Sequence, residues 1–171
     1  MPDSVESDGL VIDTSVWLNL MATEAMGTIL DALAVPCYAP EQVVTEIRRH
    51  PGTRTTFLAG NHPLRQMRVS ILSLENEELD LFLEIVGAPS GDALGDGEAA
   101  AIVVAASRRL DLVIDDRKAR RILRERFSQV RTYWTVDLFR ASTVVTALGR
   151  TQVEEYFTKA VRIGRMHVPR T

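Results

Sequence analysis

The fold is decided by the stretch LVIDTS, residues 10–15, and by its counterpart LVIDDR, residues 112–117. In both stretches a short apolar run ends at an aspartate, and a helical pattern follows. Such a run is typical of a buried parallel strand, and the carboxyl end of such a strand is where α/β sheets place ligands. We therefore expect Asp13 and the pair Asp115-Asp116 to lie at the same edge of one sheet.

Strand and helix patterns alternate along the rest of the chain. Short strands are expected at residues 10–13, 35–38, 68–74, 110–115 and 129–132. Helices are expected within residues 14–33, at 40–49, 75–86, 98–109, 117–127 and 135–148, and after a capping-box pattern at 151–154. The alternation predicts one α/β domain over residues 10–171, with a mostly parallel central sheet flanked by helices. A flexible acidic segment, residues 1–9, is expected before it.

Two local features are predicted within these helices. Pro40 is suited to the first position of its helix. One apolar stripe of the helix at 75–86 is formed by Leu79, Phe82, Leu83 and Val86.

Composition places the chain among single-domain proteins without disulfides. It has 171 residues and one cysteine, Cys37, so a reducing compartment is the natural environment, and the thiol is expected to be buried rather than nucleophilic. The longest apolar run, residues 99–106, has eight residues, whereas a membrane span needs about 20. With no signal-peptide pattern either, we expect a soluble cytoplasmic protein without membrane association. The formal net charge of −3 argues only weakly against nucleic-acid binding, because the two signs are segregated.

Four acidic positions are the candidates for chemistry, and two of them lie in the first half of the chain. Asp13 follows a strand, where aspartate also serves as a helix cap. Thr14 and Ser15 beside it supply hydroxyls that can hold the carboxylate or a ligand water. Glu46 lies on the same helix face as the apolar Val43, although an ordinary solvated glutamate has the same pattern.

Glu98 is the most informative single acid. It follows Gly97, which lets backbone approach closely, and it opens an apolar helix whose dipole favours negative charge at that end. Complementation of the dipole alone is the other interpretation, and Asp96 is a secondary candidate in the same loop. Asp115 and Asp116 are adjacent at a strand end, so usually only one faces a site, and the residues alone do not separate them.

Carboxylates that meet at one site repel each other unless a cation lies between them. At an effective dielectric of about 20, two ionised groups roughly 5 Å apart cost about 3 kcal/mol. Oxygen-only ligands favour hard divalent ions, so the cluster predicts a site for Mg²⁺ or Mn²⁺.

The order of these motifs resembles the PIN-domain family. The similarity is carried by VIDTSV at residues 11–16, by VP at 35–36 leading to PxxVxxE at 40–46, by GEAxAI at 97–102 and by VIDDRKAR at 113–120. It covers roughly residues 10–127 and is nearest to the branch with a Gly-Glu-Ala third-acid motif, whereas many relatives have aspartate at that position.

The resemblance implies a metal-dependent endoribonuclease, a hydrolase that is often the toxin of a bacterial or archaeal toxin–antitoxin pair. By motif position the catalytic acids are Asp13, Glu46, Glu98 and Asp116, with Asp115 as the alternative fourth acid. Asp13, Glu98 and the fourth acid would ligate one or two metal ions, and Glu46 would position the attacking water or take up its proton. The likeness also suggests RNA as substrate, a homodimer, and a cognate antitoxin protein as partner.

RNA binding would need positive charge near these acids. One stripe of the helix that follows them carries Arg117, Arg120, Arg121 and Arg124, at positions i, i+3, i+4 and i+7. We expect this stripe to contact the RNA backbone, although a solvated charged face has the same spacing.

Two other functions are compatible with parts of the sequence. A haloacid-dehalogenase-like phosphatase also uses a strand-end aspartate and a later aspartate pair with Mg²⁺, but its nucleophile motif needs a second aspartate where this chain has Ser15. The other alternative is a non-catalytic PIN-fold module that binds RNA or a protein, and the presence of all four acids argues against it.

Overall fold

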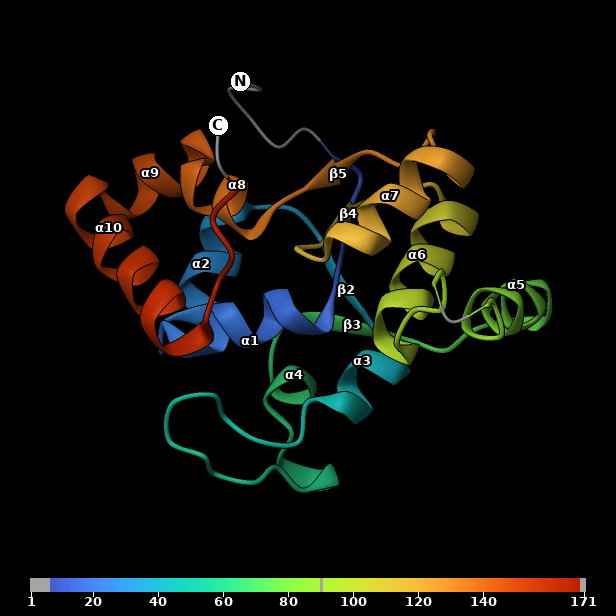
Figure 1. Ribbon diagram of the computed structural model, residues 1–171. Helices are drawn as coiled ribbons and strands as arrows, with labels where there is room; N and C mark the ends of the chain where they lie inside the picture. The colour runs from blue at the N-terminus through green and yellow to red at the C-terminus, as the bar shows by residue number, and fades with distance from the viewer. Residues whose placement is uncertain (1–6, 90, 170–171) are drawn as a thin grey trace.

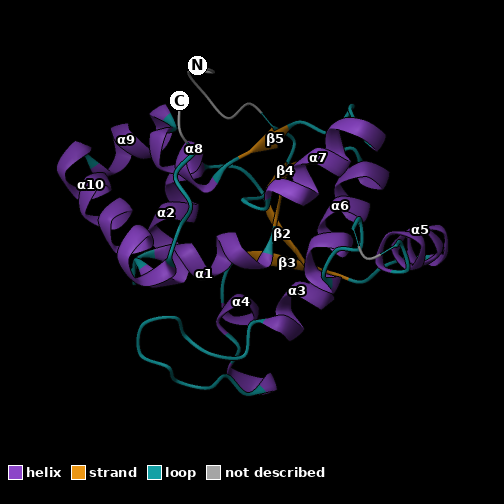
Figure 2. Cartoon of the chain, in the orientation of Figure 1, coloured by secondary structure: helices purple, strands orange, loops and turns teal. Residues whose placement is uncertain are grey.

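Five short parallel strands form the centre of the molecule. The computed structural model describes residues 7–89 and 91–169. Its strands are β1 (Leu10–Ile12), β2 (Cys37–Pro40), β3 (Val69–Leu72), β4 (Asp111–Val113) and β5 (Thr132–Tyr133), and the sheet order is β3-β2-β1-β4-β5. Each neighbouring pair is parallel. The predicted α/β fold with a parallel central sheet is therefore confirmed (Figure 2).

Helices cover the sheet and extend beyond it. They are α1 (Thr14–Ala22), α2 (Met26–Leu33), α3 (Glu41–Glu46), α4 (Pro63–Gln66), α5 (Asn76–Val86), α6 (Asp96–Arg108), α7 (Arg117–Arg126), α8 (Thr135–Arg140), α9 (Ser142–Leu148) and α10 (Arg150–Lys159). Two shorter turns are η1 (Ala59–Asn61) and the π-helical η2 (Ala160–Gly164). Figure 1 shows α2, α8, α9 and α10 on one side of the strands and α5, α6 and α7 on the other.

The strand order explains why the acids begin at one place. β1 pairs with β2 on one side and with β4 on the other. The chain runs outward from β1 to β3 and then crosses to β4, so β1 and β4 form a topological switch point, where α/β sheets open a ligand crevice at the carboxyl ends of the strands. Asp13 follows β1 directly, and Asp115-Asp116 come shortly after β4.

Two apolar cores lie on opposite faces of the sheet. Successive residues of a strand point to opposite faces, so Leu10 and Ile12 belong to one core and Val11 belongs to the other. The first core includes the fully buried Trp17 of α1 and residues of α8, α9 and α10, whereas the second is built on α6 and α7. The sheet is thus covered on both faces, as parallel sheets require.

The predicted boundaries around the second strand are wrong by a few residues. The strand expected at 35–38 is Cys37–Pro40, so Pro40 ends β2 and caps α3 instead of opening the helix. α3 ends at Glu46 rather than near residue 49, because Ile47 leaves the helical region with a ψ of 87°. The other strands overlap their predicted ranges.

The helices after the sheet also differ from prediction. The single helix expected at 135–148 is divided into α8 and α9, because Ala141 adopts an extended conformation with φ −57° and ψ 131°. The capping box expected at 151–154 is wrong as well. α10 begins earlier, at Arg150, after Gly149 with a φ of 79°.

Only part of the apolar stripe predicted on α5 faces the core, since Phe82 and Val86 pack against the second core. Leu79 and Leu83 are 43% and 63% exposed, whereas Ile85 is 1% exposed. Glu78 is buried, and its two carboxylate oxygens accept hydrogen bonds from Arg108 of α6, each at 2.8 Å. This ion pair turns a charged residue of α5 toward α6, which the apolar spacing does not reveal.

The structure bears on two expectations from composition. Cys37 is buried, and burial raises the pKa of its thiol to about 12, which makes it a packing residue. In the described part of the chain, no helix combines the length and apolarity that crossing a bilayer would require. Residues 1–6 of the expected flexible segment lie outside the described residues.

Candidate active site

Asp13 lies between the end of β1 and the first turn of α1, and it is only 1% exposed. Its Oδ2 accepts hydrogen bonds from the backbone N–H of Ser15 at 3.2 Å and from the Ser15 hydroxyl at 2.6 Å, which caps the helix. Its Oδ1 is also buried but has no hydrogen-bond partner among the described residues. A buried carboxylate oxygen without a donor is unfavourable until an ion or a water completes it.

Glu46 reaches the same crevice from the end of α3. Its Oε2 accepts a hydrogen bond from the Thr14 hydroxyl at 2.5 Å, and its Oε1 accepts one from the backbone N–H of Gly97 at 2.8 Å. A Cβ atom at Gly97 would lie 2.5 Å from Oγ1 of Thr14 and 2.8 Å from Cδ of Glu46. Only glycine therefore leaves room for the carboxylate, and three segments far apart in sequence meet around it.

Glu98 faces the crevice from the first turn of α6. Its Oε2 accepts a hydrogen bond from the backbone N–H of Gly95 at 3.3 Å. The same oxygen and Oε1 of Glu46 each lie 3.9 Å from the position of a Cβ atom on Gly95, so the two carboxylates flank this residue. Burial, together with the charges of Asp116 and Asp13, raises the pKa of Glu98 to about 7.

The structure gives Asp115 and Asp116 different surroundings. Asp115 is buried and accepts hydrogen bonds from the backbone and hydroxyl of Thr135, at 2.8 and 2.7 Å, and from Nδ2 of Asn19 at 3.0 Å. These bonds tie β4 to α8 and α1. Asp116 caps α7, and its charge acts on Glu98. The charge of Asp116 therefore reaches Glu98, whereas the oxygens of Asp115 are used by the fold.

The site carries excess negative charge in partly desolvated surroundings. Burial raises the pKa of Asp13 to about 6, the hydrogen bonds from Ser15 oppose this rise, and the charge of Glu46 adds to it. Carboxylate oxygens and the unpartnered Oδ1 are suited to a hard divalent ion, which commonly keeps several of its own waters. Within residues 7–89 and 91–169, no three carboxylate, imidazole or thiol groups converge closely enough to hold an ion by themselves.

The secondary candidates occupy two kinds of position. Thr14 and Ser15 hold the carboxylates of Glu46 and Asp13 through the hydrogen bonds described above. Asp96 is exposed and lines an outer cleft beside Glu46. It therefore lies at the rim of the crevice.

The predicted arginine stripe on α7 does not form one uniform surface. Arg121 is ion-paired with Asp92 at 2.6 Å and with Glu125 at 3.3 Å. Arg120 donates hydrogen bonds to two backbone carbonyls, at 3.1 and 3.0 Å, and its guanidinium carbon lies 4.0 Å from the ring centroid of Trp134. Both arginines thus have partners within the protein, which their helical spacing does not reveal.

Arg117 and Arg124 have different surroundings from these two. Both are exposed and line a pocket of about 350 Å³ with Trp134 and His167. Arg117 Nη2 lies 3.1 Å from Nε2 of His167, which comes from the C-terminal end of the chain. Of the four predicted arginines, these two present charge to the outside.

Sequence reasoning missed three residues around the site. Asn19 and Thr135 hold Asp115, and Asn19 was detectable as an amide among apolar positions of a buried helix. Thr135 has no local signal, because its contact depends on β5 lying next to β4. Lys118 was not singled out, yet its charge lowers the pKa of Glu98 against the larger effects that raise it.

Comparison with known proteins gives one match. A family model described as a PIN domain matches residues 9–141, which extend from β1 through α8 and contain all the acids discussed above. Curated proteins and solved structures each give no match. The part of the chain from α9 onward lies beyond the matched residues.

Proposed function

Because this chain belongs to the PIN-domain family, whose members are generally nucleases and typically depend on divalent metal, we propose that it is a ribonuclease that hydrolyses RNA phosphodiester bonds with Mg²⁺ or Mn²⁺. The observation that carries the proposal is the buried Oδ1 of Asp13, which lacks a hydrogen-bond donor among the described residues. The charges of Glu46, Glu98 and Asp116 act on the same crevice. Such a cluster is unfavourable for the fold alone, and a bound divalent cation would relieve its repulsion.

Asp13, Glu98 and Asp116 would hold the ion together with water molecules that the ion keeps, since the three carboxylates do not enclose it by themselves. Ser15 fixes one oxygen of Asp13, the other oxygen has no hydrogen-bond partner in the described part of the chain, and Gly95 orients Glu98. A bound divalent cation would lower the pKa of a water molecule and neutralise charge that develops on the scissile phosphate.

Glu46 would position the attacking water and accept its proton. Thr14 and the backbone of Gly97 hold its two oxygens, so its carboxylate is oriented before substrate arrives. A general base must lie within hydrogen-bond reach of the proton that it takes, and a fixed carboxylate meets this requirement without reorganisation. Thr14 and Gly97 are therefore positioning residues in this mechanism.

Arg117 and Arg124 would contact the RNA backbone. Both are exposed on the helix that Asp116 caps, so their charge lies close to the acids along the chain. Arg120 and Arg121 would contribute indirectly, since their guanidinium groups are already engaged.

The biological role proposed here is that of a toxin that acts as a homodimer and is restrained by a cognate antitoxin protein, and the family membership supports it. Induced expression should then arrest bacterial growth, while the Asp13→Asn variant should not. Normal growth with active wild-type enzyme in the cells would contradict the toxin role without affecting the proposed chemistry.

Cleavage of a mixed panel of single-stranded RNAs tests the ribonuclease proposal. Purified protein is assayed with Mg²⁺ or Mn²⁺ and with EDTA, beside Asp13→Asn and Glu98→Gln. We expect cleavage only with metal, reduced by at least about 100-fold in both variants, in line with losses at metal-site residues. Cleavage that persists in EDTA, or that survives in Asp13→Asn, would contradict the proposal.

A further inference from the structure

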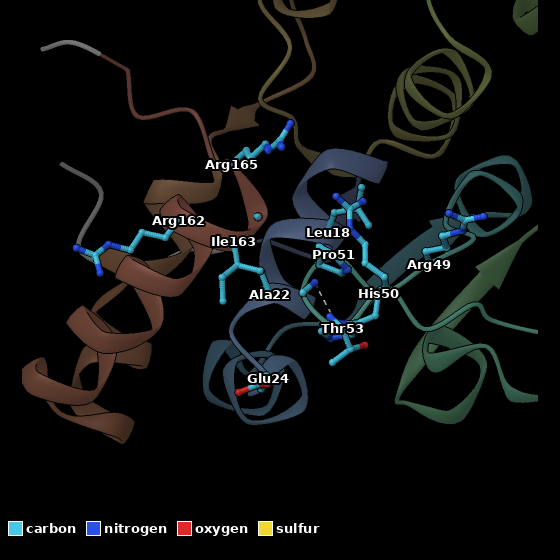
Figure 3. Close-up of a pocket in the computed structure, with 13 residues that line it drawn as sticks. Leu18, Ala22, Glu24, Arg49, His50, Pro51, Thr53, Arg162, Ile163 and Arg165 are labelled. Carbon is cyan, nitrogen blue, oxygen red and sulfur yellow. Dashed lines mark hydrogen bonds between the residues drawn. The ribbon is translucent and has the colours of Figure 1, made fainter.

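A basic pocket of about 670 Å³ lies between α1, the loop after α3 and the C-terminal end of the described chain (Figure 3). We call it the arginine pocket, because four arginines line it: Arg49, Arg54, Arg162 and Arg165. The acidic residue in its lining, Glu24, is ion-paired with Lys159 at 3.2 Å. The pocket therefore has a strongly positive lining in a protein whose net charge is −3.

Both walls of the arginine pocket are held by local contacts. In the loop wall, the backbone N–H of His50 donates to the carbonyl of Thr55 at 2.9 Å, and Nδ1 of His50 accepts from the N–H of Gly52 at 3.2 Å. In the C-terminal wall, η2 packs so tightly on α1 that a Cβ atom at Gly164 would lie 2.7 Å from Oδ1 of Asn19. The pocket is therefore formed before any ligand arrives.

The four arginines are exposed, and their side chains have neither salt bridges nor hydrogen bonds within the described part of the chain. Arg162 and Arg165 come from the C-terminal segment and Arg49 comes from the loop after α3, and the side chains of Arg162 and Arg49 extend outward at opposite ends of the pocket (Figure 3). Exposed positive charge spread along a pocket in this way favours an extended polyanion over a single small anion. Arginine is suited to phosphate in particular, because its guanidinium donates hydrogen bonds in a planar fork.

The floor of the arginine pocket is apolar. It is formed by Leu18 and Ala22 of α1 and by Ile163 of η2, which is 41% exposed. A nucleotide has a matching combination of surfaces, since its base presents an apolar face and its phosphate a negative charge. An acidic peptide would use the arginines but would gain little from this floor.

The pocket shares two elements with the acid cluster. Leu18 of α1 lies five residues after Asp13, which caps the same helix, a distance of about 7.5 Å along the axis at roughly 1.5 Å per residue. Arg49 follows Glu46 by three residues. A strand of RNA bound at the acids could thus extend along α1 into the arginine pocket.

We propose that the arginine pocket binds nucleotides of the RNA substrate that flank the cleaved bond, with successive phosphates of the strand near Arg49, Arg165 and Arg162 and a base on the apolar floor. The proposal rests on the ribonuclease function proposed above. Arg162 and Arg165 lie beyond the residues that match the family, so this chain would add a substrate contact of its own.

Binding of a labelled single-stranded RNA, measured by fluorescence anisotropy over a range of salt concentrations in EDTA, tests the proposal without requiring cleavage. The double variant Arg162→Ala/Arg165→Ala removes two pocket charges. Arg140→Ala/Arg150→Ala removes two exposed charges outside the pocket and is the matched control. We expect the slope of log K against log salt to fall by about 1.4 in the pocket variant, at about 0.7 per phosphate contact on a single strand, and to stay unchanged in the control.

Three outcomes would overturn the proposal. In the first, the pocket variant binds RNA with the wild-type salt slope. In the second, the control loses as much of this slope as the pocket variant does. In the third, polyglutamate binds as tightly as RNA and depends equally on the two arginines, which would identify an acidic polypeptide as the occupant. Thermal unfolding checks that both variants fold. If wild-type protein binds RNA through the pocket but cuts nothing with metal, the ribonuclease proposal fails and the binding site stands.

Discussion

Replacing Asp13 by asparagine should stabilise the metal-free protein while it abolishes metal binding. Asparagine keeps an oxygen that accepts the two hydrogen bonds from Ser15, and its amide takes the place of Oδ1, which has no partner among the described residues. Only the buried negative charge is lost. The negative charge that a metal site requires thus lowers the stability of the metal-free protein.

The magnitude follows from the pKa of Asp13, which burial raises from its ordinary value of 3.8 to about 6. A shift of about 2 units corresponds to about 3 kcal/mol, at about 1.4 kcal/mol per unit. Because the folded-state pKa is raised, the stability associated with this group is complete below about pH 4 and is lost as the pH rises through about 6. Asp13→Asn should therefore unfold about 6–12 °C higher than wild type near pH 8, at about 2–4 °C per kcal/mol, and this difference should vanish near pH 4.

Thermal unfolding in EDTA from about pH 4 to 8 measures this difference. The control is Asp115→Asn, the same change two positions beyond β4, where both carboxylate oxygens accept hydrogen bonds. That variant should be destabilised by about 1–3 kcal/mol, because an amide leaves a buried donor unpaired. A destabilised Asp13→Asn, or a stabilisation that is equal at both ends of the pH range, would refute the reasoning.

Three further predictions concern the crevice and α7. Gly97→Ala should lower RNA cleavage by at least about 10-fold and destabilise the fold by about 1–3 kcal/mol, because its Cβ would overlap the Glu46 carboxylate. Cleavage kinetics and thermal unfolding measure the two effects, and a variant with unchanged cleavage and stability would remove Glu46 from the mechanism. Mg²⁺ affinity measured by calorimetry should rise with pH up to about 7 and level off above it, since the pKa of Glu98 is about 7 and only its ionised form is a ligand. An affinity that does not change from about pH 5 to 8 would contradict this prediction. Arg124→Ala should reduce the slope of log K for RNA binding against log salt by about 0.7 and leave stability unchanged. Arg120→Ala should mainly destabilise the protein, because its guanidinium binds two backbone carbonyls. A lower slope in Arg120→Ala with unchanged stability would instead make Arg120 a direct RNA contact.

Much of the fold and the convergence of the acids could be predicted from the sequence because both depend on local patterns. The apolar runs that end at Asp13 and Asp115 mark strands, and parallel strands bring their carboxyl ends together. Gly97 before Glu98 indicated a close approach of backbone, and the structure shows that the Glu46 carboxylate occupies this space.

The remaining features depend on contacts between distant segments. Leu79 and Leu83 have the spacing of a buried stripe, but the partner that orients α5 is a charged residue of α6. Arg120 has the spacing of a surface contact, but the carbonyls that it binds come from the ends of neighbouring strands. Asp115 and Asp116 are distinguished by Asn19 and Thr135, which hold Asp115, and Thr135 reaches the site through the pairing of β4 with β5.

Calorimetric titration of the protein with Mn²⁺ at about pH 8, above the pKa of about 6 for Asp13 and of about 7 for Glu98, tests the central claim most directly. The claim is that Asp13 and its neighbouring acids hold a divalent ion, whereas Asp115 serves the fold. We expect saturable binding by wild type and by folded Asp115→Asn, and no binding by Asp13→Asn. Absence of binding to wild type, or binding that Asp13→Asn retains, would contradict the account.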